Sequence, residues 1–187
     1  MSDLSSQWRA RAVHFAVLAL SLVAPAASAQ SPADADFKAI SAHVLTLPKY
    51  KQYLDATVNL ANVATKDPKL AERLDGYGNG SLAEQAKLLE GIPQVRGAIS
   101  GAGLTTRDYV LTQGALLQAG MAYAMTKAGN VPADSMIKKA GVSRTNLEFY
   151  QENETEIARL AKEAEARAPK PPAEPEDEGE DEESVAE

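Results

Sequence analysis

The sequence contains no cysteine, and this absence removes several kinds of protein chemistry. Thiol catalysis, covalent haem attachment, zinc sites with cysteine ligands and lipid anchoring on a cysteine are all excluded. Disulfide bonds are excluded as well, so the fold depends on its hydrophobic core. An exported eukaryotic domain more often carries disulfides, so for an exported chain the lack of cysteine favours a bacterial periplasm.

Histidine is almost as scarce, with 2 in 187 residues. His14 falls in the predicted leader described below, which leaves His43 as the one side chain suited to acid–base or metal chemistry near neutral pH. We interpret His43 as a surface or partly packed residue. The alternative, a haem held by His43 with Met121 or Met125, is weaker because methionine in a helical core usually fills gaps. We therefore expect no catalytic residue, no metal site and no cofactor.

The sequence also lacks the patterns of a β-sheet and of a repeat protein. No stretch alternates polar and apolar residues, valine and isoleucine are sparse, and nothing recurs at a fixed period. The expected fold class is therefore all-α, a compact helical bundle around a long buried central helix at about residues 106–128.

The N-terminus has the three parts of a cleavable export signal. Arg9 and Arg11 precede an apolar run at Val13–Val23, and a small-x-small pattern then predicts cleavage between Ala29 and Gln30. The run is about half the roughly 20 residues that a membrane-spanning helix needs, so an uncleaved anchor is the weaker alternative. We expect residues 1–29 to be a signal peptide, and the mature protein to be periplasmic or secreted, with no integral membrane segment.

Negative charge is concentrated at the C-terminus. Residues 169–187 carry nine acidic side chains and one lysine, a net charge of −8, and the leader carries +1. Because the whole chain carries −7, residues 30–168 are neutral. The domain therefore has no field that would attract nucleic acid or an anionic membrane. We expect a helical domain over 30–168 and a disordered Pro/Glu-rich tail over 169–187, since the tail has too little apolar surface to fold.

Proline and glycine mark the ends of the predicted helices. Proline suits the first turn, where its missing N–H has no partner, and Pro48, Pro68 and Pro93 occupy such positions. Ser81 and Glu84 match a capping box. The expected helices are 34–45, 48–66, 68–74 with Asp67 as N-cap, 81–90, 93–100, 106–128, 134–140 and 143–168.

The predicted central helix has apolar residues on every face. Such a helix is normally buried all round, and its many small residues allow close approach of neighbours. Gln113 and Gln118 point about 140° apart, so we expect two separate structural hydrogen bonds and no shared pocket. These glutamines, with Arg107 and Asp108 at the start, also disfavour a membrane span.

Three further features have both a binding interpretation and a structural one. The glycine-rich loop at residues 76–80 precedes a helix, but it follows no strand and we interpret it as a linker. Lys49, Lys51 and the nearby tyrosines could contact a polymer, although Tyr50 and Tyr53 fit the core. The acidic run at 176–183 could collect cations weakly, but it lacks the spacing of a calcium loop.

One segment resembles a known group of proteins. The pattern G-L-T-x-x-D-Y-V at residues 103–110, the long Ala- and Leu-rich helix after it, and Ser143, Asn146, Leu147 and Phe149 at the start of the last helix resemble small uncharacterised exported all-helical bacterial proteins. The resemblance implies an exported helical domain. It carries over no catalytic or binding residue.

These observations predict a non-enzymatic exported protein that acts through contacts with a protein or an envelope polymer. The alternative is a periplasmic binder that holds a small apolar ligand between the central helix and its neighbours. An enzyme would have to work with carboxylates or tyrosines alone, and no acidic pair can be placed for that chemistry. The sequence predicts neither the partner nor the oligomeric state.

Overall fold

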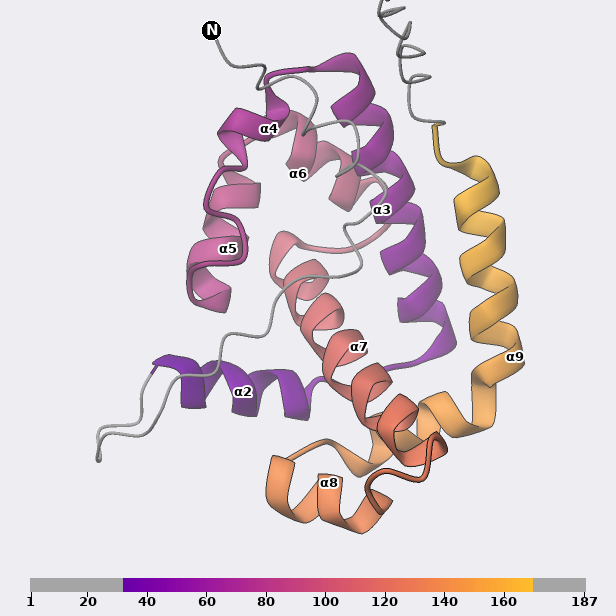
Figure 1. Ribbon diagram of the computed structural model, residues 1–187. Coiled ribbons are helices and arrows are strands. Elements are labelled where there is room, and N and C mark those ends of the chain that lie inside the picture. The colour runs from indigo at the N-terminus through magenta and orange to yellow at the C-terminus, as the bar shows by residue number, and fades with distance from the viewer. Residues whose placement is uncertain (1–31, 170–187) are drawn as a thin grey trace, which may run out of the picture. The chain divides into compact units, whose positions relative to one another are not determined.

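The computed structural model describes residues 32–169, and this part of the chain is a bundle of helices without a strand (Figure 1). The all-α prediction is therefore confirmed. The predicted leader, its cleavage site at Ala29 and Gln30, and residues 170–187 of the predicted tail lie outside the described residues. The helices are α2 (Pro32–Ala42), α3 (Leu47–Lys66), α4 (Leu70–Arg73), α5 (Leu82–Glu90), α6 (Pro93–Ser100), α7 (Thr106–Lys127), α8 (Ala133–Ala140) and α9 (Arg144–Arg167).

The helix starts follow from side chains that accept hydrogen bonds from exposed backbone amides. Ser81 and Glu84 form both halves of the predicted capping box at the start of α5. Thr105 accepts from the amide of Asp108 at the start of α7, and Ser143 accepts from the amide of Asn146 at the start of α9. Most predicted boundaries are therefore within one or two residues of the observed ones.

Asp67 differs from its predicted role. It was expected to cap the helix that follows, but its backbone N–H donates to the carbonyl of Val63 and so closes α3. Its carboxylate accepts from the amide of Lys69, 3.1 Å away. The regular part of α4 begins only at Leu70, because a turn at residues 68–69 separates it from Asp67.

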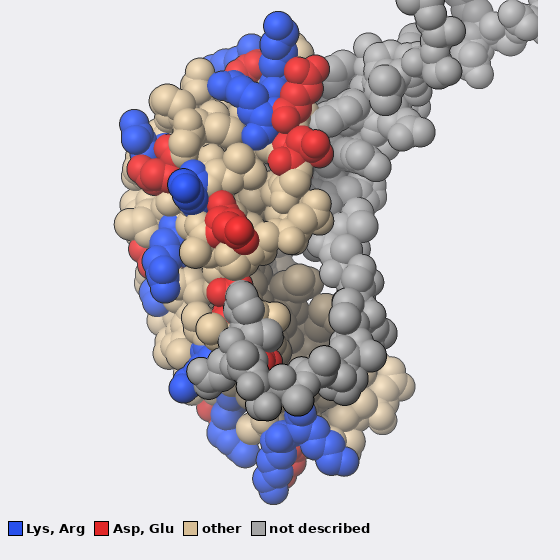
Figure 2. Space-filling view, turned by 90° about the vertical axis from the view of Figure 1, so that its left-hand side faces the viewer, with Lys and Arg blue, Asp and Glu red and all other residues tan. Residues whose placement is uncertain are grey.

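The surface of the described part carries both signs of charge side by side. On the face drawn in Figure 2, lysines and arginines are interspersed with aspartates and glutamates, and neither sign covers that face. This mixture agrees with the neutral net charge of residues 30–168.

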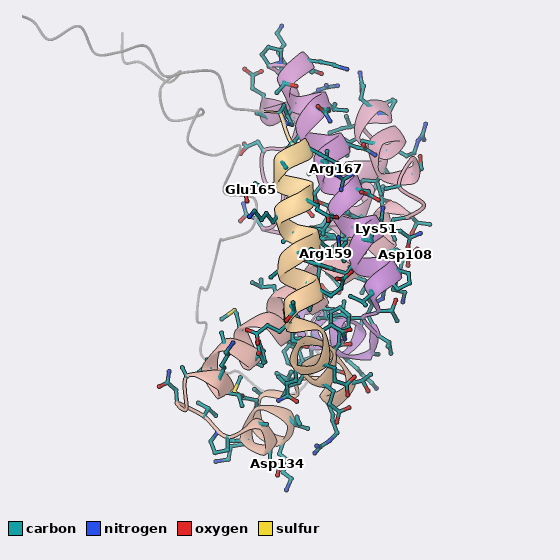
Figure 3. The ribbon with its side chains drawn as sticks, turned by 90° about the vertical axis from the view of Figure 1, so that its right-hand side faces the viewer. Lys51, Asp108, Asp134, Arg159, Glu165 and Arg167 are labelled. Atoms are coloured by element: carbon teal, nitrogen blue, oxygen red, sulfur yellow. The ribbon has the colours of Figure 1, made fainter. Side chains whose placement is uncertain are left out.

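The last helix bends, which the sequence did not predict. Asn153 has non-helical backbone angles, φ −117° and ψ 16°, and its side-chain amide donates to the carbonyl of Phe149 at 2.8 Å. The bend directs the second half of α9 along α3 (Figure 1). There Arg167, labelled in Figure 3, forms an ion pair with Asp55 of α3 at 2.8 Å.

Asp55 is the centre of this contact between α3 and α9. Burial alone would raise the pKa of Asp55, but hydrogen bonds from Lys51 and Arg167 outweigh it, so the pKa is lowered. The carboxylate therefore stays ionised in the folded protein and helps to hold the end of α9 on α3.

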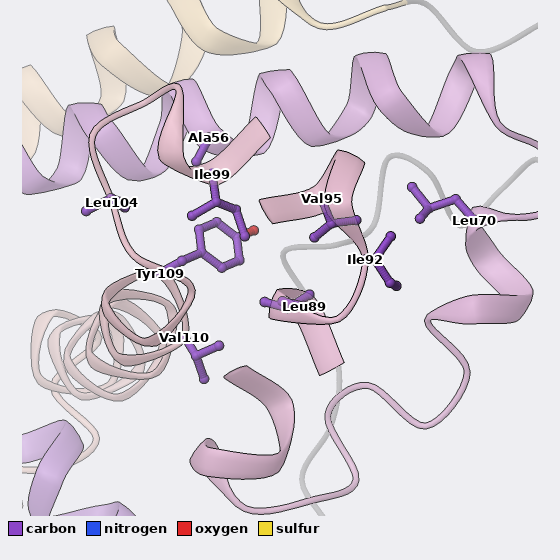
Figure 4. Close-up of a cluster of buried hydrophobic side chains, with 9 residues drawn as sticks. All are labelled: Ala56, Leu70, Leu89, Ile92, Val95, Ile99, Leu104, Tyr109 and Val110. Atoms are coloured by element: carbon purple, nitrogen blue, oxygen red, sulfur yellow. The ribbon is translucent and has the colours of Figure 1, made fainter. Parts of the chain in front are cut away.

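The interior is built around α7, which packs against α2, α3, α5, α6, α8 and α9. Its first turns join the apolar cluster between α3, α5 and α6 (Figure 4). Its middle packs between α3 and α9, and its last turns pack against α8 and the start of α9. The predicted central helix is thus confirmed. Within residues 32–169, no helix is long and apolar enough to cross a membrane.

Candidate interaction surface

His43 is partly packed, as interpreted from the sequence. Its Nε2 lies 3.0 Å from the hydroxyl of Thr112, which is fully buried on α7. Burial lowers the pKa of His43, Lys49 lowers it further, and Asp108 opposes both. These surroundings favour the neutral imidazole, which makes a structural contact between the end of α2 and α7.

The structure does not bring His43 together with the two methionines weighed as haem ligands. Thr112 precedes Met121 by nine residues, which places the two on opposite sides of α7 and about 13 Å apart along its axis. The arrangement needed for a His–Met haem site is therefore absent from these residues. No group of three or more histidine, aspartate or glutamate side chains in the described range is placed to hold a metal ion.

Gln113 and Gln118 make separate structural hydrogen bonds, as predicted. The hydroxyl of Tyr77 donates to Gln113 Oε1 at 2.6 Å. On the other side of the helix, Gln118 Nε2 donates to the hydroxyl of Ser41 at 3.2 Å, and this hydroxyl donates to the carbonyl of Gly141 at 2.9 Å. The second set joins α2, α7 and the end of α8.

Neighbouring side chains fill the space beside the small residues of α7. A Cβ atom at Gly114 would lie 2.8 Å from Ile40 of α2, and one at Gly120 would lie 3.0 Å from the hydroxyl of Tyr150 of α9. Ala115 and Ala119 are fully buried. These residues therefore permit close helix packing, and they do not line a crevice between α7 and its neighbours.

The basic and aromatic residues at the start of α3 also divide as interpreted. Tyr50 is buried, and Tyr53 stacks on Tyr109 with ring centroids 5.1 Å apart. Lys51 is exposed and forms an ion pair with Asp55 at 2.6 Å. The tyrosines thus belong to the core, and no basic-aromatic patch is presented to solvent here.

Two open pockets lie away from the exposed face of α7. One, of about 340 Å³, lies between the start of α3 and the first half of α9. The other, of about 490 Å³, lies between the end of α5 and the start of α7. The linings are mixed: Leu45, Thr46, Leu47, Thr145, Glu148, Phe149, Glu152 and Asn153 for the first, and Ala86, Lys87, Glu90, Gly91 and Thr106 for the second.

The second half of α7 differs from its predicted burial. Leu117 is 48% exposed, Met121 is 40% exposed and Met125 is 38% exposed. These residues are spaced four apart, so they form one line along the helix, which we call the apolar stripe. The helix is therefore not buried all round, because α2, α8 and α9 cover its other sides and leave this one open.

No charged residue interrupts this part of α7. Between Asp108 and Lys127 the sequence has no aspartate, glutamate, lysine or arginine. The exposed side of a surface helix normally carries charged or polar residues. Phe37 of α2 is also 43% exposed, and its ring packs against Gly141 beside the Ser41 hydrogen bonds. The apolar stripe is thus exposed to solvent, although it has the composition of a buried helix face.

The sequence placed these residues on faces of the central helix but gave no signal for their exposure. Leu117, Met121 and Met125 satisfy the pattern of a buried helix as well as any other apolar residue of α7. Only the positions of the neighbouring helices distinguish the stripe from the core.

Comparison with protein-family models, with curated proteins and with solved structures finds no match to this chain.

Proposed function

We propose that this chain is a non-enzymatic exported protein whose helical domain docks a partner protein through the apolar stripe of α7. The observation that carries the proposal is the exposure of Leu117, Met121 and Met125 at four-residue spacing on a helix face without charge. Exposed apolar groups of this kind mark contact surfaces, since water covers them at a cost.

The geometry of the stripe favours a helical segment as the occupant. Eight residues separate Leu117 from Met125, which corresponds to about 12 Å along the helix axis. An amphipathic helix presents apolar residues at the same three- or four-residue spacing and can pack along such a line. Methionine side chains are flexible and adapt to irregular partners. A charged polymer fits less well, because the stripe has no charge and the domain is neutral.

The alternative of a small apolar ligand beside the central helix has less support. It depended on small residues leaving a crevice along α7, and Gly114 and Gly120 are instead in close contact with Ile40 and Tyr150. The proposal of export depends on the leader pattern at residues 1–29 and on cleavage before Gln30.

Site-specific photocross-linking in the producing bacterium tests the docking surface. A photoreactive residue at Met121 of the full chain should form a discrete adduct with one protein. The same residue at Lys162, an exposed position on α9, is the matched control and should form none. The substitution Leu117→Gln should reduce the adduct at position 121 several-fold, because it removes apolar contact area from an exposed position without disturbing the core.

Three results would contradict this proposal. The first is an adduct of equal yield from Lys162, and the second is an adduct that Leu117→Gln leaves unchanged. The third is an adduct of twice the mass of the chain, which would assign the stripe to self-association. Peptide mapping of the adduct should place the cross-link among apolar residues of the partner spaced three or four apart.

A further inference from the structure

We propose that Met121 and Met125 are an oxidation site, at which a hydroperoxide converts the two thioethers to sulfoxides and thereby closes the apolar stripe to its partner. The oxidation itself is independent of any partner. The effect on docking rests on the proposed function above.

The sulfur content of the chain singles out these residues. There is no cysteine, so no thiolate competes for an oxidant. Of the four methionines, Met1 lies in the predicted leader, and the described part of the chain contains Met121, Met125 and Met136. Met121 and Met125 are 40% and 38% exposed, one turn apart on the same line of α7.

Met136 provides an internal comparison. It lies on α8, is only partly exposed, and packs against the cluster of Ala122, Val142 and Leu147. An oxidant in water therefore has freer access to the thioethers of the stripe than to that of Met136. The three residues share one chemistry and differ in burial, so their relative rates report the geometry of the fold.

The reaction needs only the thioether and the oxidant. A lone pair of Sδ attacks one oxygen of hydrogen peroxide, an S–O bond forms and the O–O bond breaks. The released hydroxide takes the proton of the transferred oxygen and leaves as water. Sulfur loses two electrons to the peroxide, and the product is methionine sulfoxide, which reductases can return to methionine.

The sulfoxide changes the stripe without changing the core. In the free protein Met121 and Met125 are 40% and 38% exposed, so we expect each new oxygen to reach water and the fold to keep its contacts. In a docked complex the oxygens would be covered by apolar side chains, and α7 offers no charged donor between Asp108 and Lys127. A buried acceptor without a donor is unfavourable. We expect each sulfoxide to weaken docking by about tenfold or more.

Peroxide titration of the full chain, read in three ways, tests the site. Peptide mass spectrometry should show oxidation at Met121 and Met125 at least about threefold faster than at Met136. The midpoint of thermal unfolding should remain unchanged while the first two residues are oxidised. Retention on phenyl-agarose, which reports exposed apolar surface, should fall in step with the sulfoxide content of the stripe.

Leucine variants separate the two methionines of the stripe from the third. The double variant Met121→Leu/Met125→Leu keeps an apolar stripe of similar volume and should retain full binding to phenyl-agarose after peroxide treatment. The variant Met136→Leu should lose retention as the unaltered protein does. Oxidation of Met136 at an equal or higher rate would overturn the proposal. Loss of retention by the double variant, or unfolding that accompanies oxidation of the stripe, would overturn it too.

This result is separable from the test of docking. Oxidation and chromatography require no partner, so they can succeed even when no cross-link forms at position 121. In that case the oxidation site stands and the docking function fails. Where the cross-link does form, a photoreactive residue placed at Leu117 leaves both methionines in the chain. Peroxide should lower the yield of the adduct from this position, and the variant Met121→Leu/Met125→Leu should keep the yield.

Discussion

Asn146 holds the connection between α2 and α3 with both ends of its side-chain amide. Its Oδ1 accepts from the backbone N–H of Leu45 at 2.9 Å, and its Nδ2 donates to the carbonyl of His43 at 2.8 Å. The side chain is fully buried at the start of α9. One residue thus provides hydrogen-bond partners for two backbone groups that lie beyond the end of α2. It also joins segments about 100 residues apart in the sequence.

Replacing Asn146 by alanine should destabilise the domain strongly. The change leaves two backbone groups without partners, the buried amide of Leu45 and the partly buried carbonyl of His43, which costs about 2–4 kcal/mol. Urea unfolding followed by circular dichroism measures this loss. Asn62→Ala is the matched control, since the side chain of Asn62 donates to the carbonyl of Val58 within its own helix and its loss should cost less than about 1 kcal/mol. Equal effects of the two substitutions would refute the role given to Asn146.

Close approach between helices depends on particular glycines of α7. Gly120 lies beneath Tyr150 of α9, whose hydroxyl donates to the carbonyl of Leu116 at 3.0 Å. The ring of Tyr150 also stacks on Tyr123, with centroids 5.9 Å apart. This ring is held from two sides and has little freedom to move away from a new atom.

Alanine at two helical glycines should therefore have opposite effects. Gly120→Ala places a Cβ 3.0 Å from the Tyr150 hydroxyl and should cost about 1–2 kcal/mol through overpacking. Gly97→Ala on α6 meets nothing within 4 Å and should stabilise the protein by about 0.5–1 kcal/mol, because alanine favours a helix. Thermal unfolding of the two variants compares them directly. A stabilising Gly120→Ala would show that α9 packs on α7 less tightly than described.

The described bundle and the C-terminal residues differ in net charge. Residues 30–168 are neutral, and the net charge of the chain comes almost entirely from residues 169–187. Within residues 32–169, α9 is held by contacts that include the ion pair of Arg167 with Asp55. Net charge keeps a protein soluble without strengthening its core.

A chain that ends at Ala168 should keep the unfolding temperature of the longer chain within about 2 °C, because every residue of the described core is kept. Its solubility near neutral pH should fall, since the net charge moves from −8 in the mature chain to zero. Differential scanning calorimetry and a precipitation assay measure the two quantities. A large drop in unfolding temperature would show that residues 169–187 contribute to folding.

The positions of the helices could be predicted because their signals are local. Ser81 with Glu84, Thr105 and Ser143 each satisfy backbone amides within one turn, and Pro48 and Pro93 suit only the first turn of a helix. The separate partners of Gln113 and Gln118 also followed from their angle around the axis. These features need no knowledge of the other helices.

The bend of α9 and the exposure of the apolar stripe depend on the assembled bundle. Asn153 is an ordinary helix residue until α9 must contact both α7 and α3, and its side-chain amide then donates to the carbonyl of Phe149. Leu117, Met121 and Met125 have the pattern of core residues, yet no described helix covers them. Local sequence decides which residues form a helix, whereas the positions of distant helices decide which side of it meets water.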